Sequence, residues 1–307
     1  MLLTAVAIVG LMAVALPAAA ITWGTPDDGA HPMVGQLFYF VADDIDPRFD
    51  DPGAWYSCTG TLLSSTVVLT AGHCTHGIGA DGGSTLDDGG SGGTDVWITF
   101  EEFPNIDEVL TGLGSDSYER DENGDRYADW AAAFDADQRW HGGTAFPHED
   151  YDPARFVMAD VGVVVLDTPV PTEEVGAYGE LPDAGYLDVV SRDRSHDQLF
   201  TPVGYGVQAM VPFYDAGGTR QWSTSKLIGV RGTHGIPAGV AAKFSNNLGK
   251  KHTGGACSGD SGGPLFEQGG FLIGAITSYG ISPCIGNDGA YRIDKDLDLA
   301  WIRSFSN

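Results

Sequence analysis

A glycine-rich stretch near the C-terminal end of the chain holds a serine that could act as a nucleophile. The stretch is G-G-A-C-S-G-D-S-G-G-P-L, residues 254–265, and Ser261 lies within it between Asp260 and Gly262. Glycines let the backbone approach a ligand closely and free N–H groups from regular structure. A serine beside such donors could attack a carbonyl carbon while the N–H groups stabilise the resulting oxyanion. An ordinary Gly/Ser turn is the other interpretation, and only the rest of the chain can decide between them.

A nucleophilic serine needs a histidine as its base and a carboxylate that orients this histidine. All eight histidines precede Ser261; they are His31, His73, His76, His141, His148, His196, His234 and His252. An α/β-hydrolase needs its histidine after the serine, so that fold is excluded. The chain orders His–Asp–Ser and Asp–His–Ser remain open. The second order requires a parallel α/β sheet with many helices, whereas this sequence shows one clear helix pattern.

The composition indicates a turn-rich, β-dominated globular protein. The 307 residues include 44 glycines and 16 prolines, and 42% of them are hydrophobic, which is enough for one large or two medium domains. The 42 acidic and 16 basic residues give a formal net charge of −26. Such a surface repels nucleic acid and anionic membranes, so we expect neither as a partner.

Residues 2–20 form an apolar run that ends in Ala18-Ala19-Ala20. An apolar segment followed by small residues is typical of a secretory signal peptide, and cleavage after Ala20 would make Ile21 the new N-terminus. The basic residues that usually precede such a run are missing. A membrane anchor is the alternative, because the run is nearly long enough to span a bilayer. We expect residues 1–20 to be a signal peptide and the protein to be secreted, which permits disulfides.

Four cysteines form two widely separated pairs along the chain, Cys58 with Cys74 and Cys257 with Cys284. Three pairings are possible in principle, and the local one closes two short loops. A zinc site built from all four cysteines is the alternative, but the chain lacks the C-x-x-C spacing typical of such sites.

Short apolar segments separated by turn residues predict strands. The predicted strands are residues 33–42, 57–63, 66–69, 96–100, 138–146, 161–166, 199–206, 223–230 and 271–278. Residues 294–305 predict a helix with Leu297, Trp301 and Phe305 on one face. There are two acidic insertions, residues 77–95 and 107–137. The first is expected to be a solvated loop, and the second is expected to be anchored by Trp130 and Phe134.

Within the second insertion, four residues resemble the first ligands of a calcium loop; they are Asp121, Asn123, Asp125 and Asp129. The match is incomplete, because Arg126 stands where the loop needs glycine and Ala132 stands where it needs glutamate. An acidic surface loop is therefore the favoured interpretation, and we expect no metal and no cofactor.

Three segments together resemble the secreted, bacterial-type members of the trypsin/chymotrypsin-like serine proteases. They are Thr70-Ala71-Gly72-His73-Cys74, Asp160 before an apolar strand, and Gly259-Asp260-Ser261-Gly262-Gly263-Pro264. The resemblance implies an all-β fold of two antiparallel six-stranded β-barrels, packed face to face, with a C-terminal helix. A protease domain would then cover residues 21–307, with barrels at about 34–170 and 198–293 and the helix at 294–305.

The resemblance also implies roles for individual residues. Ser261 would be the nucleophile, His73 the general base and acid, and Asp160 the carboxylate that orients the imidazole. Asp160 is preferred to Asp167 because an apolar strand follows it. The N–H groups of Gly259 and Ser261 would form the oxyanion hole.

In this family a newly liberated N-terminal amine inserts into the protein and pairs with the aspartate before the nucleophile. Here the resemblance implies the pair Ile21 and Asp260, although Thr22 and Trp23 depart from the usual residues. His76, three residues after His73, is expected at the surface.

The S1 pocket, which receives the substrate residue P1 on the acyl side of the scissile bond, follows from the same resemblance. Its floor would be Gly255, six residues before Ser261, followed by Ala256. Its walls would be Ser278, Tyr279, Gly280 and Gly289, braced by a Cys257–Cys284 disulfide. None of these residues offers a carboxylate, so we expect cleavage after large apolar or aromatic residues. Asp288 lies close enough in the sequence to change this expectation.

We therefore expect a secreted, monomeric serine endopeptidase that acts on protein or peptide substrates through an acyl-enzyme. A non-catalytic protease homologue acting as an extracellular binding protein is the alternative from another class. It is disfavoured because all three triad positions are filled. An esterase that uses the same triad is the alternative among enzymes.

Overall fold

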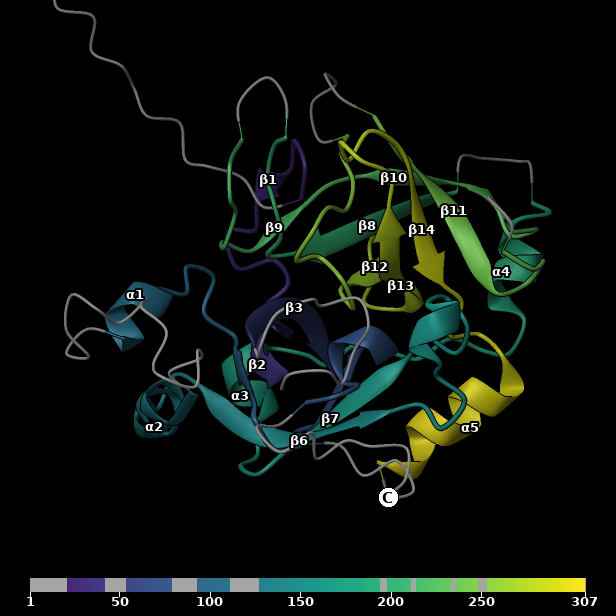
Figure 1. Ribbon diagram of the computed structural model, residues 1–307. Helices are drawn as coiled ribbons and strands as arrows, with labels where there is room; N and C mark the ends of the chain where they lie inside the picture. Colours follow the sequence, from purple (N-terminus) through teal and green to yellow (C-terminus); the bar gives the residue numbers. More distant parts are fainter. Residues whose placement is uncertain are drawn as a thin grey trace, which may run out of the picture.

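The computed structural model describes residues 21–41, 54–78, 93–110, 127–193, 198–210, 214–232, 236–247 and 253–306 (Figure 1). The expected signal peptide, residues 1–20, lies outside these ranges. So do Asp121, Asn123 and Asp125 of the calcium-like motif, whereas Asp129 lies in the first turn of a helix.

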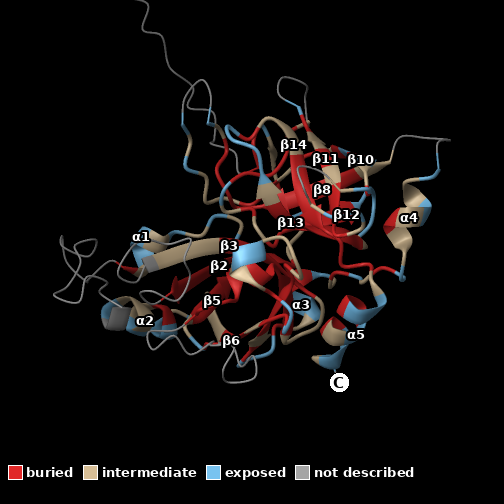
Figure 2. Cartoon of the chain, turned by 45° about the vertical axis from the view of Figure 1, so that its right-hand side comes forward, coloured by how far each residue is buried: buried red, intermediate tan, exposed pale blue. Residues whose placement is uncertain are grey.

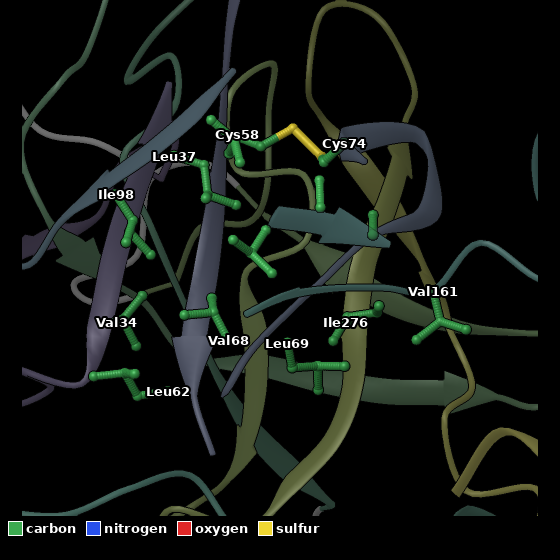
Figure 3. Packing of buried hydrophobic residues seen from close by; sticks show 14 of the residues in the cluster. Val34, Leu37, Cys58, Leu62, Val68, Leu69, Cys74, Ile98, Val161 and Ile276 are labelled. Carbon is green, nitrogen blue, oxygen red and sulfur yellow. A yellow bond between two sulfur atoms is a disulfide. The ribbon is translucent and has the colours of Figure 1, made fainter. Parts of the chain in front are cut away.

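The first half of the chain forms a closed barrel of six antiparallel strands. In their order around the barrel, the strands are β2 (Val34–Val41), β3 (Ala54–Leu62), β4 (Val67–Thr70), β7 (Gly162–Leu166), β6 (His141–Pro147) and β5 (Val96–Thr99). The pairing of β5 with β2 closes the ring. Figure 3 shows its apolar interior, where Val34, Leu37 and Ile98 lie close together.

The second half forms another six-stranded antiparallel barrel. Its strands, in order around the ring, are β8 (Leu199–Gly204), β10 (Ser225–Gly229), β11 (Ala241–Asn246), β14 (Gly286–Tyr291), β13 (Ile273–Gly280) and β12 (Pro264–Glu267). The pairing of β12 with β8 closes it. Two short strands, β9 (Gln221–Trp222) and β1 (Thr25–Pro26), extend from β8. The predicted all-β fold of two six-stranded barrels is confirmed.

Helix α5 (Asp296–Ser304) ends the fold and packs against the first barrel, where Phe305 meets Phe146 at 5.2 Å between ring centroids (Figure 1). Of the three residues predicted to share one face, Leu297 is 79% exposed. The buried residues of the helix are Asp298, Leu299 and Ile302, and the carboxylate of Asp298 accepts a hydrogen bond from the Tyr291 hydroxyl at 2.9 Å.

The second acidic insertion contains a helix, α2 (Tyr127–Ala136), that the sequence did not predict (Figure 1). Phe134 of this helix is fully buried against Phe38 and Trp97, with ring centroids 5.1 and 5.6 Å apart. The indole N–H of Trp97 also donates to Asp135 at 2.8 Å. This part of the insertion is therefore packed on the barrel, and the predicted anchoring by Trp130 and Phe134 is confirmed.

Three further helices are short: α1 (Ile106–Val109), α3 (Thr172–Val175) and α4 (Tyr186–Val190). In Figure 2 the residues of the barrel strands are mostly buried, while the helices at the periphery include exposed residues. Within the described ranges, no helix has the length and apolar character needed to cross a membrane.

The cysteines pair locally, as Cys58–Cys74 and Cys257–Cys284. The first disulfide joins β3 to the turn that carries His73, as Figure 3 shows for the two sulfur atoms. Because all four sulfurs are used in disulfides, the alternative of a four-cysteine zinc site is excluded.

Candidate active site

His73 lies in a tight turn, Gly72–Cys74, directly after strand β4. The preceding Gly72 lets the Tyr151 ring pack closely, since a Cβ there would lie 3.0 Å from a ring carbon. The neighbouring Cys74 is tied to β3 through its disulfide with Cys58. The turn is therefore fixed at two points of the barrel: it follows strand β4, and the Cys58–Cys74 disulfide ties it to β3.

Asp160 directly precedes β7, is fully buried, and holds the imidazole of His73. His73 Nδ1 lies 3.0 Å from both carboxylate oxygens, and the main-chain N–H of His73 donates to Oδ1 at 2.9 Å. The hydroxyl of Ser278 donates to Oδ2 at 2.5 Å. With Nδ1–H directed at the carboxylate, Nε2 is the nitrogen able to accept a proton. Asp167 follows the far end of β7 and is exposed, so it takes no part in this arrangement.

Two features around this pair were not predicted from the sequence. Ala159 adopts a left-handed backbone conformation, with φ of 53°, immediately before Asp160. Such a conformation is unfavourable for alanine and is kept only where the surroundings enforce it. The ring of Phe156 lies 4.8 Å from that of His73 and covers one side of the imidazole.

The turn that carries Ser261 packs against the segment leading to His73. Gly262 has φ of 77°, and a Cβ there would collide with the Thr70 hydroxyl and come within 2.7 Å of the Ala71 nitrogen. The main-chain N–H of Thr59 donates to the carbonyl of Ser261 at 2.8 Å. Among the described residues, no hydrogen bond joins the Ser261 hydroxyl to His73. Contacts of this kind are often long in a substrate-free site.

In the described part of the chain, the N–H groups of Gly259 and Ser261, the expected oxyanion donors, have no hydrogen-bond acceptor. Gly259 has φ of 94°, and a Cβ there would lie 2.8 Å from the Cα of Gly206. The turn can therefore adopt this conformation only with glycine at this position.

Asp260 points away from Ser261 into the protein interior and is fully buried. Its carboxylate accepts hydrogen bonds from the main-chain N–H groups of Cys257 and Gly206, each at 2.8 Å. Burial raises the pKa of Asp260 to about 7, and the negative charge of Asp288 adds to the effect.

Ile21, the expected partner of Asp260, is also completely buried. The next residue, Thr22, pairs with the Ser261 stretch, because its N–H donates to the carbonyl of Gly255 at 2.9 Å. Its hydroxyl reaches the side chain of Asn246 at 3.2 Å. The segment after Ile21 is thus anchored beside the expected pocket floor.

The residues expected to form the S1 pocket lie on β13, β14 and the segment before Ser261. Tyr279 packs its ring against Gly289, where a Cβ would collide with it, and Gly280 pairs with Asp288 across the two strands. Ser278 has a second role, since its hydroxyl binds Asp160.

A carboxylate, that of Asp288, lies beside the residues expected to form the pocket floor. The main-chain N–H of Ala256 donates to Oδ2 of Asp288 at 2.6 Å, and the Asn246 amide donates to Oδ1 at 2.9 Å. A Cβ on Gly255 would collide with Oδ2 of Asp288. Burial raises the pKa of Asp288 to about 7, against the lowering effect of these two hydrogen bonds.

His76 does not lie at the surface as expected. Its side chain is buried, only 6% exposed, and its ring meets that of Tyr151 edge-on at 5.4 Å. His76 helps to pack the segment after the His73 turn.

One group of metal-type donors occurs in the described residues, formed by Cys58, His73 and Cys74. The two sulfurs are joined in a disulfide and cannot ligate as thiolates. The donor set therefore does not fit a metal ion.

A family model described as Trypsin matches residues 125–297, which is more than half of the chain. Among solved structures, HL collagenase is 17% identical with a TM-score of 0.56, and the alignment covers 94% of this chain and 96% of that one. GrC is 15% identical with a TM-score of 0.57, with coverage of 92% and 96%. No curated protein sequence matches the chain significantly. At these identities the structural likeness shows the fold alone.

Proposed function

The chain belongs to the trypsin family and is a serine-type peptidase, and from this premise we propose that it is an endopeptidase whose nucleophile is Ser261. The observation that carries the proposal is the arrangement of His73 on the buried carboxylate of Asp160, beside the turn that holds Ser261. Proteins or peptides are the substrates.

The reaction proceeds through an acyl-enzyme. Ser261 Oγ attacks the scissile carbonyl carbon while His73 Nε2 takes the hydroxyl proton, and the carbonyl oxygen becomes an oxyanion. The N–H groups of Gly259 and Ser261 stabilise this charge. His73 then gives its proton to the leaving amine, and the ester on Ser261 remains. A water molecule, deprotonated by His73, attacks the ester and releases the acid. The carboxylate of Asp160 orients His73 and stabilises the imidazolium that forms.

Maturation is the second part of the proposal. Removal of a signal peptide, residues 1–20, leaves one protease domain at 21–307, with barrels at about 34–170 and 198–293 and a helix at 294–305. The new amine of Ile21 then pairs with Asp260. Two facts support this pairing: Ile21 is buried, and none of the groups that set the pKa of Asp260 is basic. The two disulfides support a secreted protein.

Hydrolysis of peptide amides by the secreted, purified protein tests the proposal. The wild type should cleave them, and Ser261→Ala should lose at least about 1,000-fold in kcat. Ser258→Ala, an exposed serine in the same turn, is the matched control and should keep full activity. An inert wild type would favour the extracellular binding protein instead. Hydrolysis of esters without amides would favour the esterase.

A further inference from the structure

A groove of about 810 Å³ lies on the second barrel, where helix α4 is found beside β10 and β11 (Figure 1). Its lining comes from α4, β10 and β11 and from the segments that follow α4, β10 and β14. None of the lining residues belongs to the candidate active site. A ligand in this groove is therefore not the segment that carries the scissile bond.

The groove gathers cationic side chains from four separate parts of the chain. They are Arg192 after α4, Arg231 after β10, Lys243 on β11 and Arg292 after β14. These are four of the 16 basic residues in a chain whose formal net charge is −26. Asp188 is the one acidic residue in the lining. The fold thus builds a cationic groove on a strongly acidic protein.

Two of the four cations are left without a compensating charge. Arg292 is not one of them, since its guanidinium is only 5% exposed and lies 2.8 Å from Asp294 and 3.2 Å from Asp188. The hydrogen bond from Arg292 lowers the pKa of Asp188, so the one carboxylate of the lining is ionised and already paired. Within the described ranges, Arg231 and Lys243 have no ion-pair partner. These two side chains can therefore bind an anion without breaking an existing pair.

The lining favours a short acidic peptide as the ligand. Arginine and lysine bind carboxylates through charge-assisted hydrogen bonds. Ile228, which is 52% exposed, lines the groove together with Val230 and Ala238, and these apolar side chains can contact apolar residues of a peptide. Sulfated sugars and phosphates have no such residues. A long polyanion would also meet the acidic surface outside the groove, whereas a short segment feels chiefly the charges within about 10 Å.

Resting on the proposed function, we propose that this groove is an exosite, a binding site outside the active site, for acidic segments of protein substrates. It binds a run of aspartate or glutamate residues with apolar residues among them. Binding there raises the effective concentration of the rest of the substrate at the peptidase. Acidic proteins, which the net charge of the chain would otherwise repel, thereby become substrates.

Peptide binding to Ser261→Ala tests the site without interference from cleavage. The probe is a peptide of repeated Glu-Glu-Leu, and its neutral counterpart has glutamine in place of glutamate. We expect the acidic peptide to bind at least about tenfold more tightly, with a difference that shrinks as NaCl is raised. Combining Arg231→Gln with Lys243→Gln should abolish the difference. Lys226→Gln, an exposed lysine on β10 outside the lining, is the matched control and should keep it.

Equal binding of the two peptides, or a difference that the double substitution leaves unchanged, would overturn the proposal. A sulfated oligosaccharide that binds through Arg231 and Lys243 where the acidic peptide does not would also overturn it, because the ligand class would then be another. Neither side chain is buried, so the double variant should fold.

Hydrolysis tests the link between the groove and catalysis. The acidic or the neutral segment is joined, through flexible linkers of several lengths, to one short peptide that the wild type cleaves. We expect the acidic segment to lower KM about tenfold at the best linker length and to leave kcat unchanged. The double substitution should remove this advantage and leave cleavage of the short peptide alone as it was.

Equal KM values for the two fusions at every linker length would overturn the role of the groove in substrate binding, while the endopeptidase function would stand. A wild type that cleaves no peptide would instead contradict the proposed function. The binding measurement would then still decide whether the groove takes an acidic segment.

Discussion

The hydroxyl of Ser278 donates a hydrogen bond to Oδ2 of Asp160 at 2.5 Å. Asp160 precedes β7 of the first barrel, and Ser278 lies on β13 of the second. The carboxylate that holds His73 is therefore fixed from both barrels. The orientation of the imidazole depends on how the two barrels are packed together.

Removal of this bond by Ser278→Ala is expected to lower kcat about tenfold or more, because one of the three donors to Asp160 is lost. A hydrogen bond to a charged group contributes roughly 1.5–3 kcal/mol. KM for a short peptide should change much less, since the positioning of His73 matters most in the transition state. Steady-state kinetics on Ser278→Ala and the control Ser258→Ala measure this. Unchanged kcat in Ser278→Ala would contradict it.

The pairing of Ile21 with Asp260 predicts a difference in pH dependence between two forms of the protein. In a form extended before Ile21, burial raises the pKa of Asp260 to about 7. The unfolded chain then loses this proton at lower pH than the folded protein, so the free energy of unfolding should fall as pH rises from about 4 to 7. In the form that begins at Ile21, the amine stabilises the ionised carboxylate and this fall should be smaller.

Thermal unfolding of both forms across this pH range measures the effect. Carboxylates that do not interact with Asp260 contribute equally to both forms. The difference between the two curves therefore reports on Asp260 together with Asp288, which interacts with it. Identical curves would contradict the pairing.

The aromatic contacts of α2 predict that this part of the second insertion supports stability and not catalysis. Phe134→Ala removes a fully buried ring that packs against Phe38 and Trp97, and should cost about 3–5 kcal/mol of unfolding free energy. Phe103→Ala, where the side chain is 65% exposed, is the matched control and should cost little. Below the unfolding transition, kcat for a short peptide should be the same in both variants. Chemical denaturation and peptide hydrolysis test the two parts separately.

Much of the fold could be predicted because many strands carry an apolar pattern. Residues 161–166 are one example, and β7 (Gly162–Leu166) lies within them. Strand β14 could not be predicted in this way, since G-N-D-G-A-Y is polar and rich in glycine. The residues of β14 fit their tertiary contacts instead. Gly289 leaves room for the Tyr279 ring, and Oδ2 of Asp288 accepts a hydrogen bond from the Ala256 N–H. Tertiary contacts therefore outweigh local strand propensity here.

The same limit applies to the candidate site. The motifs around His73, Asp160 and Ser261 could be located because their residue types are distinctive. That Asp288 faces Gly255 could not be predicted, because 33 positions separate them along the chain and only the pairing of β14 with β13 and β11 brings them together. Trp130 and Phe134 could be identified as anchors of the second insertion, but helix α2, which carries both residues, was not predicted among the surrounding acidic residues.

Labelling of the active serine tests the central claim most directly. The secreted protein is treated with a serine-directed phosphonate, and the modified residue is identified by mass spectrometry of its peptides. We predict one adduct, on Ser261, with complete loss of peptidase activity and no labelling of Ser261→Ala. An unlabelled wild type, or an adduct on another residue that persists in Ser261→Ala, would contradict the account.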